Sequence, residues 1–357
     1  MTMPEVIIPF NEEELVPMDY YPPHHPMEPP VPVLRTPIKP YENMKMFLAD
    51  EKPLWMPFFV ENKMFNPSIL ADNVARKSVL QANPDPSEPV FNKDYFGIEW
   101  EYVPSVHGSM VRPGPQKVPD ICEWENYITF PDLNELDWAG SAAANKEFLN
   151  DARSIQMTVF NGFFERLISF VGMENALVAL VDPEEKEAVH RLFDRLCIFY
   201  DELFYNMAKW YEPDLLWFHD DWGSQKAPLF SLETCREMLV PYLKRAVDSA
   251  HKYGIGFEFH CCGKNEELVP AMIEAGVDMW CGQVMNDRKK MYPKYGQDIK
   301  IGIIPPKFPE NGSKEEIMKM MEELLDSYPT NAYVGMDFAV DPRFYTYLYE
   351  ASRKRYN

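Results

Sequence analysis

The sequence predicts an α/β fold in which parallel strands and their crossover helices close into a (β/α)8 TIM barrel. From residue 150 onward, short apolar runs alternate with amphipathic helical stretches, the order typical of parallel strands joined by helices. Six or more such units in about 300 residues fit a barrel better than an open sheet. Polar residues also collect where the predicted strands end, which is where barrel enzymes place their active sites.

The predicted strands are short runs rich in β-branched and aromatic residues. They cover residues 53–60, 154–160, 214–220, 254–260, 277–281, 299–304 and 332–338. Between them lie helical patterns such as 182–210 and 231–254. The expected strand ends carry His219, Asp220, Asp221, His260, Cys261, Cys262, Cys281 and Asp337.

Two segments depart from this alternation. Residues 1–40 are so rich in proline that we expect an extended N-terminal arm, followed by one barrel domain over 41–357. Residues 88–138 combine aromatic residues, prolines and glycines with alternating polarity, which predicts a β-rich elaboration beside the barrel.

Composition excludes several classes of function. The net charge of −21 leaves no basic stripe for phosphates, so we expect no nucleic-acid partner. The longest apolar runs are far shorter than the roughly 20 residues of a membrane helix. The first residues lack the order of a signal peptide, and the six cysteines are too few for a disulfide framework. A cytoplasmic protein with reduced or metal-bound thiols is expected.

The segment "GFEFHCCGKN", residues 256–265, is the strongest local indication of chemistry. Side chains alternate along a strand, so Glu258, His260 and Cys262 share one face while Cys261 points the other way. One face therefore collects three potential metal ligands. The alternative is that these thiols are small apolar core residues.

Three segments resemble the uroporphyrinogen decarboxylase superfamily, and more narrowly its cobalamin-dependent methyltransferase branch. They are "NGFFERLISFVGMENALVALVDPEE" (161–185), "HDDWGSQKAPLFSLETCREMLVPYLKRAVDSAHKYG" (219–254) and "FHCCGKNEELVPAMIEAGVD" (259–278). The resemblance spans residues 150–340 and implies a single (β/α)8 barrel. It also implies zinc held by a His-x-Cys pair and a further cysteine, and methyl exchange with a separate corrinoid protein.

His260 and Cys262 match the His-x-Cys positions, and Gly263 follows as in the family. The third family ligand, a cysteine late in the chain, is absent, because no cysteine follows Cys281. Cys281, at the end of the neighbouring predicted strand, is the first choice to complete the site. The other choices are Glu258, Cys261 or Asp337, or that no zinc is bound.

The decarboxylase reaction itself is disfavoured. The family of uroporphyrinogen decarboxylases that the chain resembles carries an arginine-rich motif soon after the first strand. The corresponding stretch here is "PLWMPFFVENKMFNP", which contains no arginine. This stretch favours a modest apolar or aromatic substrate, although a plain barrel core explains half of the candidate contacts equally well. The candidate contacts are Trp55, Phe58, Phe59, Met64 and Phe65.

Three carboxylates are candidate catalytic residues: Asp220, Asp221 and Glu258. The two aspartates could instead cap a helix or orient His260. His219 is expected as a buried hydrogen-bonding residue near the substrate, and Gln225 as part of the substrate loop.

The predicted reaction follows from the resemblance. Zinc or a nearby acid would activate a methyl ether, and the methyl group would pass to the cobalt of a corrinoid protein. The chain lacks the Asp-x-His-x-x-Gly segment that binds a corrinoid, so the corrinoid must arrive on a partner. We predict O-demethylation of a methoxylated aromatic donor. A decarboxylase of a small carboxylated substrate or porphyrinogen, an acceptor-side thiol methyltransferase and a non-catalytic binder stay open, as does a homodimer.

Overall fold

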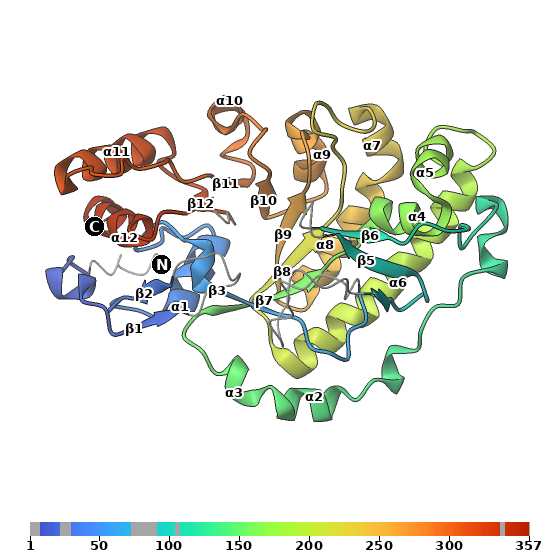
Figure 1. The fold of residues 1–357 in the computed structure, drawn as a ribbon, viewed down its shortest axis with the longest axis horizontal. Coiled ribbons are helices and arrows are strands. Elements are labelled where there is room, and N and C mark those ends of the chain that lie inside the picture. Colours follow the sequence, from blue (N-terminus) through green and yellow to red (C-terminus); the bar gives the residue numbers. More distant parts are fainter. Residues whose placement is uncertain (1–7, 22–29, 73–90, 104–107, 336–339, 357) are drawn as a thin grey trace, which may run out of the picture. The chain divides into compact units, whose positions relative to one another are not determined.

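The structure, a computed structural model, describes residues 8–21, 30–72, 91–103, 108–335 and 340–356 (Figure 1). The chain divides into two compact units. The terminal unit comprises Met1–Lys63, Ala152–Ser154 and Arg288–Asn357, and the central unit comprises Met64–Asp151 and Ile155–Asp287.

Four parallel strands form the core of the central unit: β7 (Ser154–Val159), β8 (Leu215–His219), β9 (Gly256–Cys261) and β10 (Met279–Gly282). They pair in chain order, β7 with β8, β8 with β9 and β9 with β10. Nearly all their residues are buried, as expected for parallel strands that are covered on both faces.

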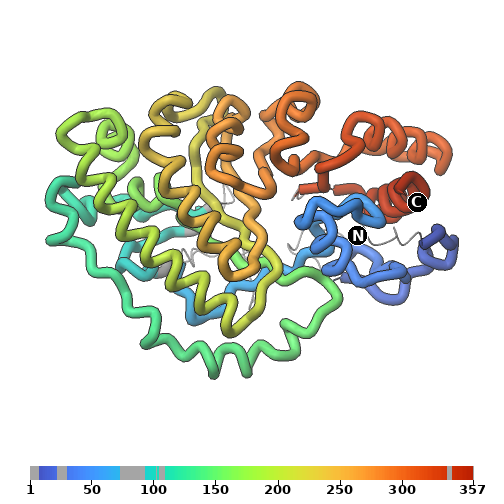
Figure 2. Tube along the Cα trace, turned by 180° about the vertical axis from the view of Figure 1, so that it is seen from behind, coloured from blue at the N-terminus to red at the C-terminus, as the bar shows by residue number. Residues whose placement is uncertain are grey.

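Helices follow β7, β8 and β9 in the central unit. They are α4 (Phe163–Val171), α5 (Met173–Ala179), α6 (Lys186–Tyr211), α7 (Leu232–Met238), α8 (Val240–Lys252) and α9 (Val269–Glu274). Helices α6 and α8 lie side by side, where Phe193 and Tyr242 pack with ring centroids 5.3 Å apart (Figure 2). This succession of parallel strand and helix confirms the predicted α/β fold of TIM-barrel type.

An antiparallel sheet precedes β7 in the central unit. It consists of β4 (Phe91–Lys93), β5 (Glu99–Val103) and β6 (Gly108–Val111), paired β4–β5–β6. Four short helices follow it, η4 (Ile121–Asn126), η5 (Leu133–Glu135), α2 (Trp138–Ala144) and α3 (Lys146–Leu149). The sheet, η4 and η5 lie within residues 88–138, the range predicted as β-rich. The boundaries of that elaboration stay a prediction.

A buried ion network ties this sheet to α4. Arg166 on α4 pairs with Asp72 through Nη2 (2.6 Å) and with Asp94 through Nη1. Asp94 also accepts hydrogen bonds from the backbone of the β4–β5 turn and from the indole of Trp100 (2.9 Å). Because every charge of the network is paired, burying it is tolerated.

The terminal unit contains two pairs of strands and its own helices. Strands β1 (Asp19–Tyr21) and β2 (Val31–Val33) pair antiparallel, and β11 (Lys300–Ile303) pairs parallel with β12 (Ala332–Val334). The remaining elements are η1 (Glu12–Leu15), α1 (Pro40–Leu48), η2 (Phe59–Glu61), α10 (Arg288–Tyr295), α11 (Lys314–Ser327) and α12 (Phe344–Tyr356), and β3 (Asn62–Phe65) begins here.

The proline-rich N-terminal segment is fixed to α12 by one buried carboxylate. Glu14 accepts hydrogen bonds from the Arg353 guanidinium (2.9 Å) and the Tyr349 hydroxyl (2.6 Å). The predicted domain boundary at residue 40 stays a prediction.

The strand predicted over 53–60 is wrong. In this stretch the structure has coil with a single bridge from Phe58 to Val334, and then η2. Two prolines interrupt the run, since proline has no N–H for a strand ladder. The side chain of Asn43 satisfies the backbone instead, accepting from Leu54 N–H (2.7 Å) and donating to the Trp55 carbonyl (3.0 Å).

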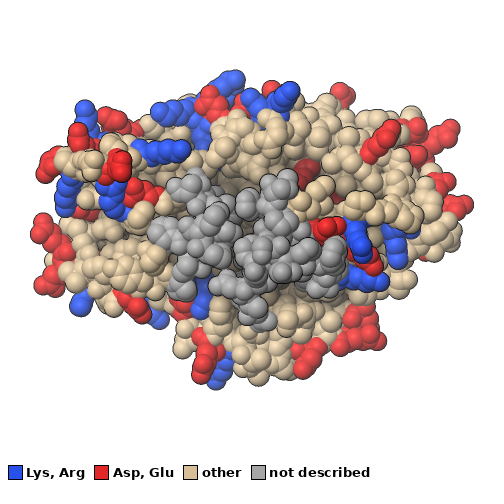
Figure 3. Space-filling view, viewed as in Figure 1, with Lys and Arg blue, Asp and Glu red and all other residues tan. Residues whose placement is uncertain are grey.

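Basic and acidic side chains are interspersed on the face shown in Figure 3. All six cysteines are free thiols. Among the described residues, no helix combines the length and apolar character needed to cross a bilayer.

Candidate metal centre

Two histidines meet at the carboxyl ends of neighbouring strands. His219 ends β8 and lies in register with His260 on β9, so both side chains leave the sheet on the same face. Their ring centroids are 5.3 Å apart, and the Trp217 ring stacks on His260 at 4.6 Å. The cross-strand pairing thus brings two imidazoles together on one indole.

Cys262 completes a group of three metal-binding side chains. Its Sγ lies 3.4 Å from His219 Nε2 and 3.6 Å from His260 Nε2. The three ligand atoms all lie within 4.8 Å of one another. Two imidazole nitrogens and one thiol are a donor set that suits zinc, whose catalytic sites use three protein ligands.

The hydrogen bonds of His219 orient the ring for metal binding. Its Nδ1–H donates to the Phe160 carbonyl at 2.7 Å, with a Glu165 carboxylate oxygen 2.9 Å away. In the neutral ring Nε2 then carries the lone pair, as in histidine ligands held by a carbonyl or carboxylate. Asp221 Oδ1 lies 2.8 Å from this Nε2. Since two lone pairs repel each other, a proton or a cation is required there.

Asp221 places negative charge beside the thiol, and Glu165 lies next to His219. Together with His219 they form a second group of possible ligands. Burial raises the pKa of Cys262, the charge of Asp221 raises it further, and the hydrogen bond with His219 acts in the opposite direction. A bound cation would reverse this balance and favour the thiolate.

Asp220 contacts the start of α4, whereas the adjacent Asp221 contacts His219. Asp220 is buried and accepts hydrogen bonds from the backbone N–H groups of Phe164 (3.0 Å) and Glu165 (2.7 Å) and from the Trp222 indole (2.9 Å). Burial raises its pKa to about 7, although these hydrogen bonds oppose the rise. Asp220 therefore caps the N-terminus of α4, which precedes it in the chain.

Strand alternation separates the two adjacent cysteines. Cys261 is fully buried on the opposite face, where its Sγ accepts the Trp222 N–H at 3.3 Å. Glu258 shares the His260 face and accepts a hydrogen bond from the Gln156 amide at 2.5 Å. Its carboxylate thus has a local partner, and its catalytic role stays a prediction.

Cys281 lies on β10 directly opposite His260 in the strand register. Among the described residues, however, neither group of clustered ligand atoms includes it. His219, which the sequence suggested only as a buried hydrogen-bonding residue, stands in that place. Asp337 lies outside the described residues.

The aromatic stretch predicted to hold substrate packs into the cores of the two units. Trp55 packs on Tyr349 at 5.3 Å, Phe58 on Tyr345 at 5.4 Å and Phe65 on Tyr211 at 5.0 Å. The five predicted contacts are buried or half-buried: Trp55, Phe58, Phe59, Met64 and Phe65. Gln225 is exposed in the loop after β8. A substrate role for these residues stays a prediction.

A network of amides holds the backbone that carries Cys262. The Asn265 side chain donates to the carbonyls of Cys261 (3.1 Å), Cys262 (3.1 Å) and Gly263 (2.9 Å). Asn286 accepts from the Asn265 backbone N–H (2.9 Å) and donates to the Gly263 carbonyl (3.0 Å). Both side chains are buried, so the Cys262 loop is fixed by hydrogen bonds that water cannot replace.

Two glycines allow this loop to pass the loop after β8. Gly263 has φ +76°, and a Cβ there would lie 2.2 Å from the Gly223 carbonyl oxygen. The Lys264 N–H donates to the Ser224 carbonyl at 2.7 Å across the same contact. Only glycine combines this φ with such a close approach of two backbones.

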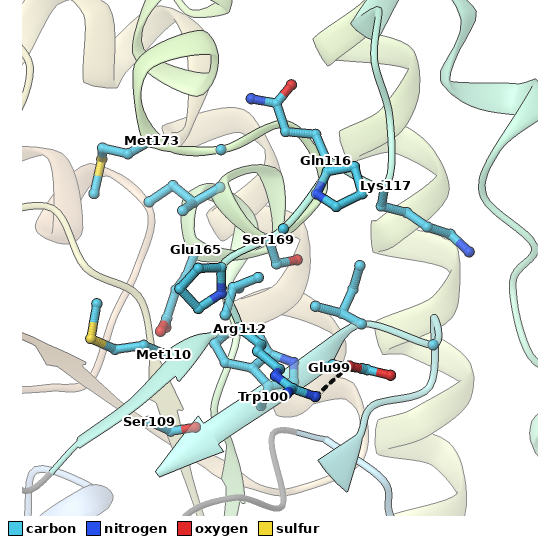
Figure 4. Close-up of a pocket in the computed structure, with 18 of the residues that line it drawn as sticks. Glu99, Trp100, Ser109, Met110, Arg112, Gln116, Lys117, Glu165, Ser169 and Met173 are labelled. Carbon is cyan, nitrogen blue, oxygen red and sulfur yellow. Dashed lines mark hydrogen bonds and ion pairs between the residues drawn. The ribbon is translucent and has the colours of Figure 1, made fainter. Parts of the chain in front are cut away.

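A pocket of about 810 Å³ adjoins the group around His219 (Figure 4). It is lined by β5, β6, the loop 112–117, α4 and the start of α5, and Glu165 and Asp221 form part of its wall. The sequence pattern did not indicate this pocket, because its parts are distant in the chain. Glu165 does lie in the quoted segment "NGFFER", but nothing local marks it as a partner of His219.

The comparison with protein families decides the relationship. Residues 169–337, which include His219, His260 and Cys262, match the family model described as "Uroporphyrinogen decarboxylase (URO-D)". This stretch, a little under half of the chain, is similar to the uroporphyrinogen decarboxylase family. The resemblance predicted from the sequence is thereby confirmed. Among curated proteins, no significant match is found.

Of the solved structures named here, the first supports the fold, and the other two are similar only in part. A "methyltransferase from Methanosarcina mazei" is 14% identical, with a TM-score of 0.60 over 90% of this chain and 100% of that chain. A sugar phosphate isomerase/epimerase from Parabacteroides distasonis has a TM-score of 0.33 at 11% identity, over 65% of this chain and 78% of that chain. An AP endonuclease, family 2, from Brucella melitensis has a TM-score of 0.32 at 14% identity, over 57% of this chain and 78% of that chain.

Proposed function

We propose that this uroporphyrinogen decarboxylase relative is a zinc-dependent methyltransferase. It would move a methyl group from a small methoxylated aromatic donor to the corrinoid of a separate protein. The convergence of His219, His260 and Cys262 carries the proposal, because their three ligand atoms lie within 4.8 Å of one another and could hold a metal ion. The similarity in fold to a methyltransferase supports the reaction type.

His260 and Cys262 would hold the metal, and two side chains compete for the third position. The Nε2 atom of His219 lies 3.4 Å from the Cys262 sulfur. Cys281 is opposite His260 in the register. We propose His219, with its Nδ1 held by the Phe160 carbonyl as an orienting contact.

When bound, zinc would supply Lewis acidity to the oxygen from which the methyl group departs. The residues around it have their own tasks. In a demethylation the bond between methyl carbon and oxygen breaks, the methyl group leaves without its bonding electrons, and the oxygen needs a proton. Asp221, about one third exposed and next to His219, would take this proton from solvent, pass it to the oxygen and remain a carboxylate between turnovers. Glu165 and the Phe160 carbonyl hold the His219 ring in position.

The test is a methyl-transfer assay. The full-length protein is mixed with zinc, a reduced corrinoid protein and a panel of methoxylated aromatics. We expect the absorbance of the corrinoid to change on methylation, with one demethylated product formed per methyl group. Release of carbon dioxide from a carboxylated substrate, without methyl transfer from any donor, would replace the proposal with the decarboxylase alternative.

A further inference from the structure

The pocket beside the candidate metal centre has its own chemistry. Its volume of about 810 Å³ lies within the range of small-molecule sites, and all of its lining belongs to the central unit. Glu165 and Asp221 are in its wall, and each contacts one nitrogen of His219. A molecule in this pocket would therefore reach the two carboxylates that flank the metal-binding group.

Much of the remaining wall of the pocket is apolar. Met110 on β6 and Met173 at the start of α5 line the pocket, and they are 55% and 46% exposed. Ile168 on α4 and Trp100 on β5 add aliphatic and aromatic surface. Methionine adapts its shape to flat or irregular ligands and contacts aromatic rings favourably. Large apolar side chains that stay exposed in a pocket next to an active site indicate a ligand that covers them.

The charges in the pocket oppose an anionic ligand. Glu165 and Asp221 lie at the end nearest His219. Of the two cations in the lining, Arg112 lies 3.4 Å from Glu99, and the Lys117 ammonium points away from Glu165 and Met110 in Figure 4. The protein as a whole carries a net charge of −21. A carboxylated ligand would thus meet negative charge without a cation directed at it.

We propose that this pocket binds the methyl donor and selects neutral aromatic methyl ethers over carboxylated ones, with Met110 and Met173 as specificity-determining residues. This inference rests on the proposed function. It places the donor against α4 and the antiparallel sheet, and it assigns a purpose to residues 97–100 and 109–117, which form one side of the pocket.

The experiment compares methoxybenzene with 4-methoxybenzoate, which differ only in the carboxylate. For the native protein with zinc and corrinoid protein we expect kcat/KM to be at least about 10-fold higher for methoxybenzene. Met110→Lys adds a cation to the apolar wall and should move this ratio at least about 10-fold toward methoxybenzoate, mainly through KM. Val178→Lys is the matched control, since Val178 is also exposed but lies outside the pocket lining, and it should leave the ratio unchanged.

Binding is measured separately by tryptophan fluorescence without any corrinoid protein, with methoxybenzene as the probe. Saturable binding that Met110→Lys weakens, without methyl transfer, would support the pocket and remove the proposed function. Methyl transfer that prefers 4-methoxybenzoate in the native protein would overturn the inference and leave the proposed function intact. A ratio of kcat/KM between the two substrates that Met110→Lys does not change would likewise overturn the inference and leave the proposed function intact.

Discussion

Two buried polar clusters, one in each unit, contrast a candidate functional site with a structural one. In the terminal unit Glu61 accepts hydrogen bonds from the Trp55 indole (2.8 Å), the Tyr345 hydroxyl (2.7 Å) and the Phe58 N–H (3.2 Å). Donors of the unit's own core surround this carboxylate. It is 1% exposed, and its partners are aromatic side chains and backbone.

The central unit shows the opposite arrangement. There the side chains of His219, His260 and Cys262 direct ligand atoms at one another, and two carboxylates next to them line a pocket. The comparison teaches that burial of a polar group does not indicate function. What distinguishes the candidate metal centre is the convergence of lone pairs, which repel unless a proton or metal ion lies between them.

The largest effect is expected from removing two ligands of the metal-binding group. The double variant His260→Ala, Cys262→Ser should lose its zinc and at least about 100-fold in methyl-transfer rate, because one ligand does not hold the metal. Elemental analysis after gel filtration measures the zinc. Cys261→Ser is the matched control, since this neighbouring cysteine lies on the opposite face of β9. Full zinc in the double variant would remove the site.

Glu61 should make stability depend on pH. Burial raises its pKa from the ordinary 4.5 to about 7, and the hydrogen bonds from Tyr345, Trp55 and Phe58 only partly oppose this. A carboxyl group whose pKa is raised in the folded state stabilises the fold fully below pH 4.5. That contribution is lost as pH rises to 7, by up to about 3 kcal/mol.

Glu61→Gln keeps the shape without the charge and should reduce this loss. Denaturant unfolding at pH 5 and pH 8 gives the free energies for the native protein and the variant. The interpretation fails if the native protein and Glu61→Gln lose the same stability between the two pH values.

A smaller effect is expected from the amides that hold the Cys262 loop. Asn286→Ala removes the hydrogen bonds to Gly263 and Asn265 and should weaken zinc binding about 10- to 100-fold in a folded protein. Competition with a chromophoric chelator gives the affinity, and circular dichroism confirms folding. The exposed Asn134, changed to alanine, is the control. Unchanged zinc affinity in Asn286→Ala would show that the loop does not need this support.

The smallest effect is expected outside both clusters. Lys244 and Asp248 form an exposed ion pair on α8 at 3.1 Å. Such pairs contribute about 0.3–0.5 kcal/mol, so Lys244→Ala should change the free energy of unfolding by no more than this, and less in high salt. A change above about 1 kcal/mol in the free energy of unfolding would mean that this surface pair contributes more than an exposed ion pair should, and would contradict the contrast between the buried clusters and the surface.

Part of this picture could be predicted from the sequence. Strand alternation placed His260 and Cys262 on one face and Cys261 on the other, because a period of two is a local property of the chain. The order of strands and helices likewise predicted the fold. The strand expected over 53–60 failed, since apolar content alone does not show where prolines interrupt a ladder.

The rest depends on contacts between distant segments. The position of His219 beside Cys262 follows from the register of β8 with β9, which no local pattern specifies. Asp220 and Asp221 are adjacent in sequence, yet one caps α4 and the other contacts His219. The pocket is lined by residues 97–100 and 109–117 and by residues between 165 and 173, rather than by 55–65. The same types of aromatic residue pack a core and line a binding site, so residue type alone does not distinguish the two roles.

The central claim is that His219, His260 and Cys262 together hold zinc. X-ray absorption at the zinc edge of the zinc-loaded full-length protein tests it most directly, because nitrogen and sulfur ligands differ in distance by about 0.2–0.3 Å. We expect two histidine nitrogens and one sulfur, with one nitrogen lost in His219→Ala. Two sulfur ligands, with one lost in Cys281→Ser and none affected by His219→Ala, would contradict the claim and assign the third position to Cys281.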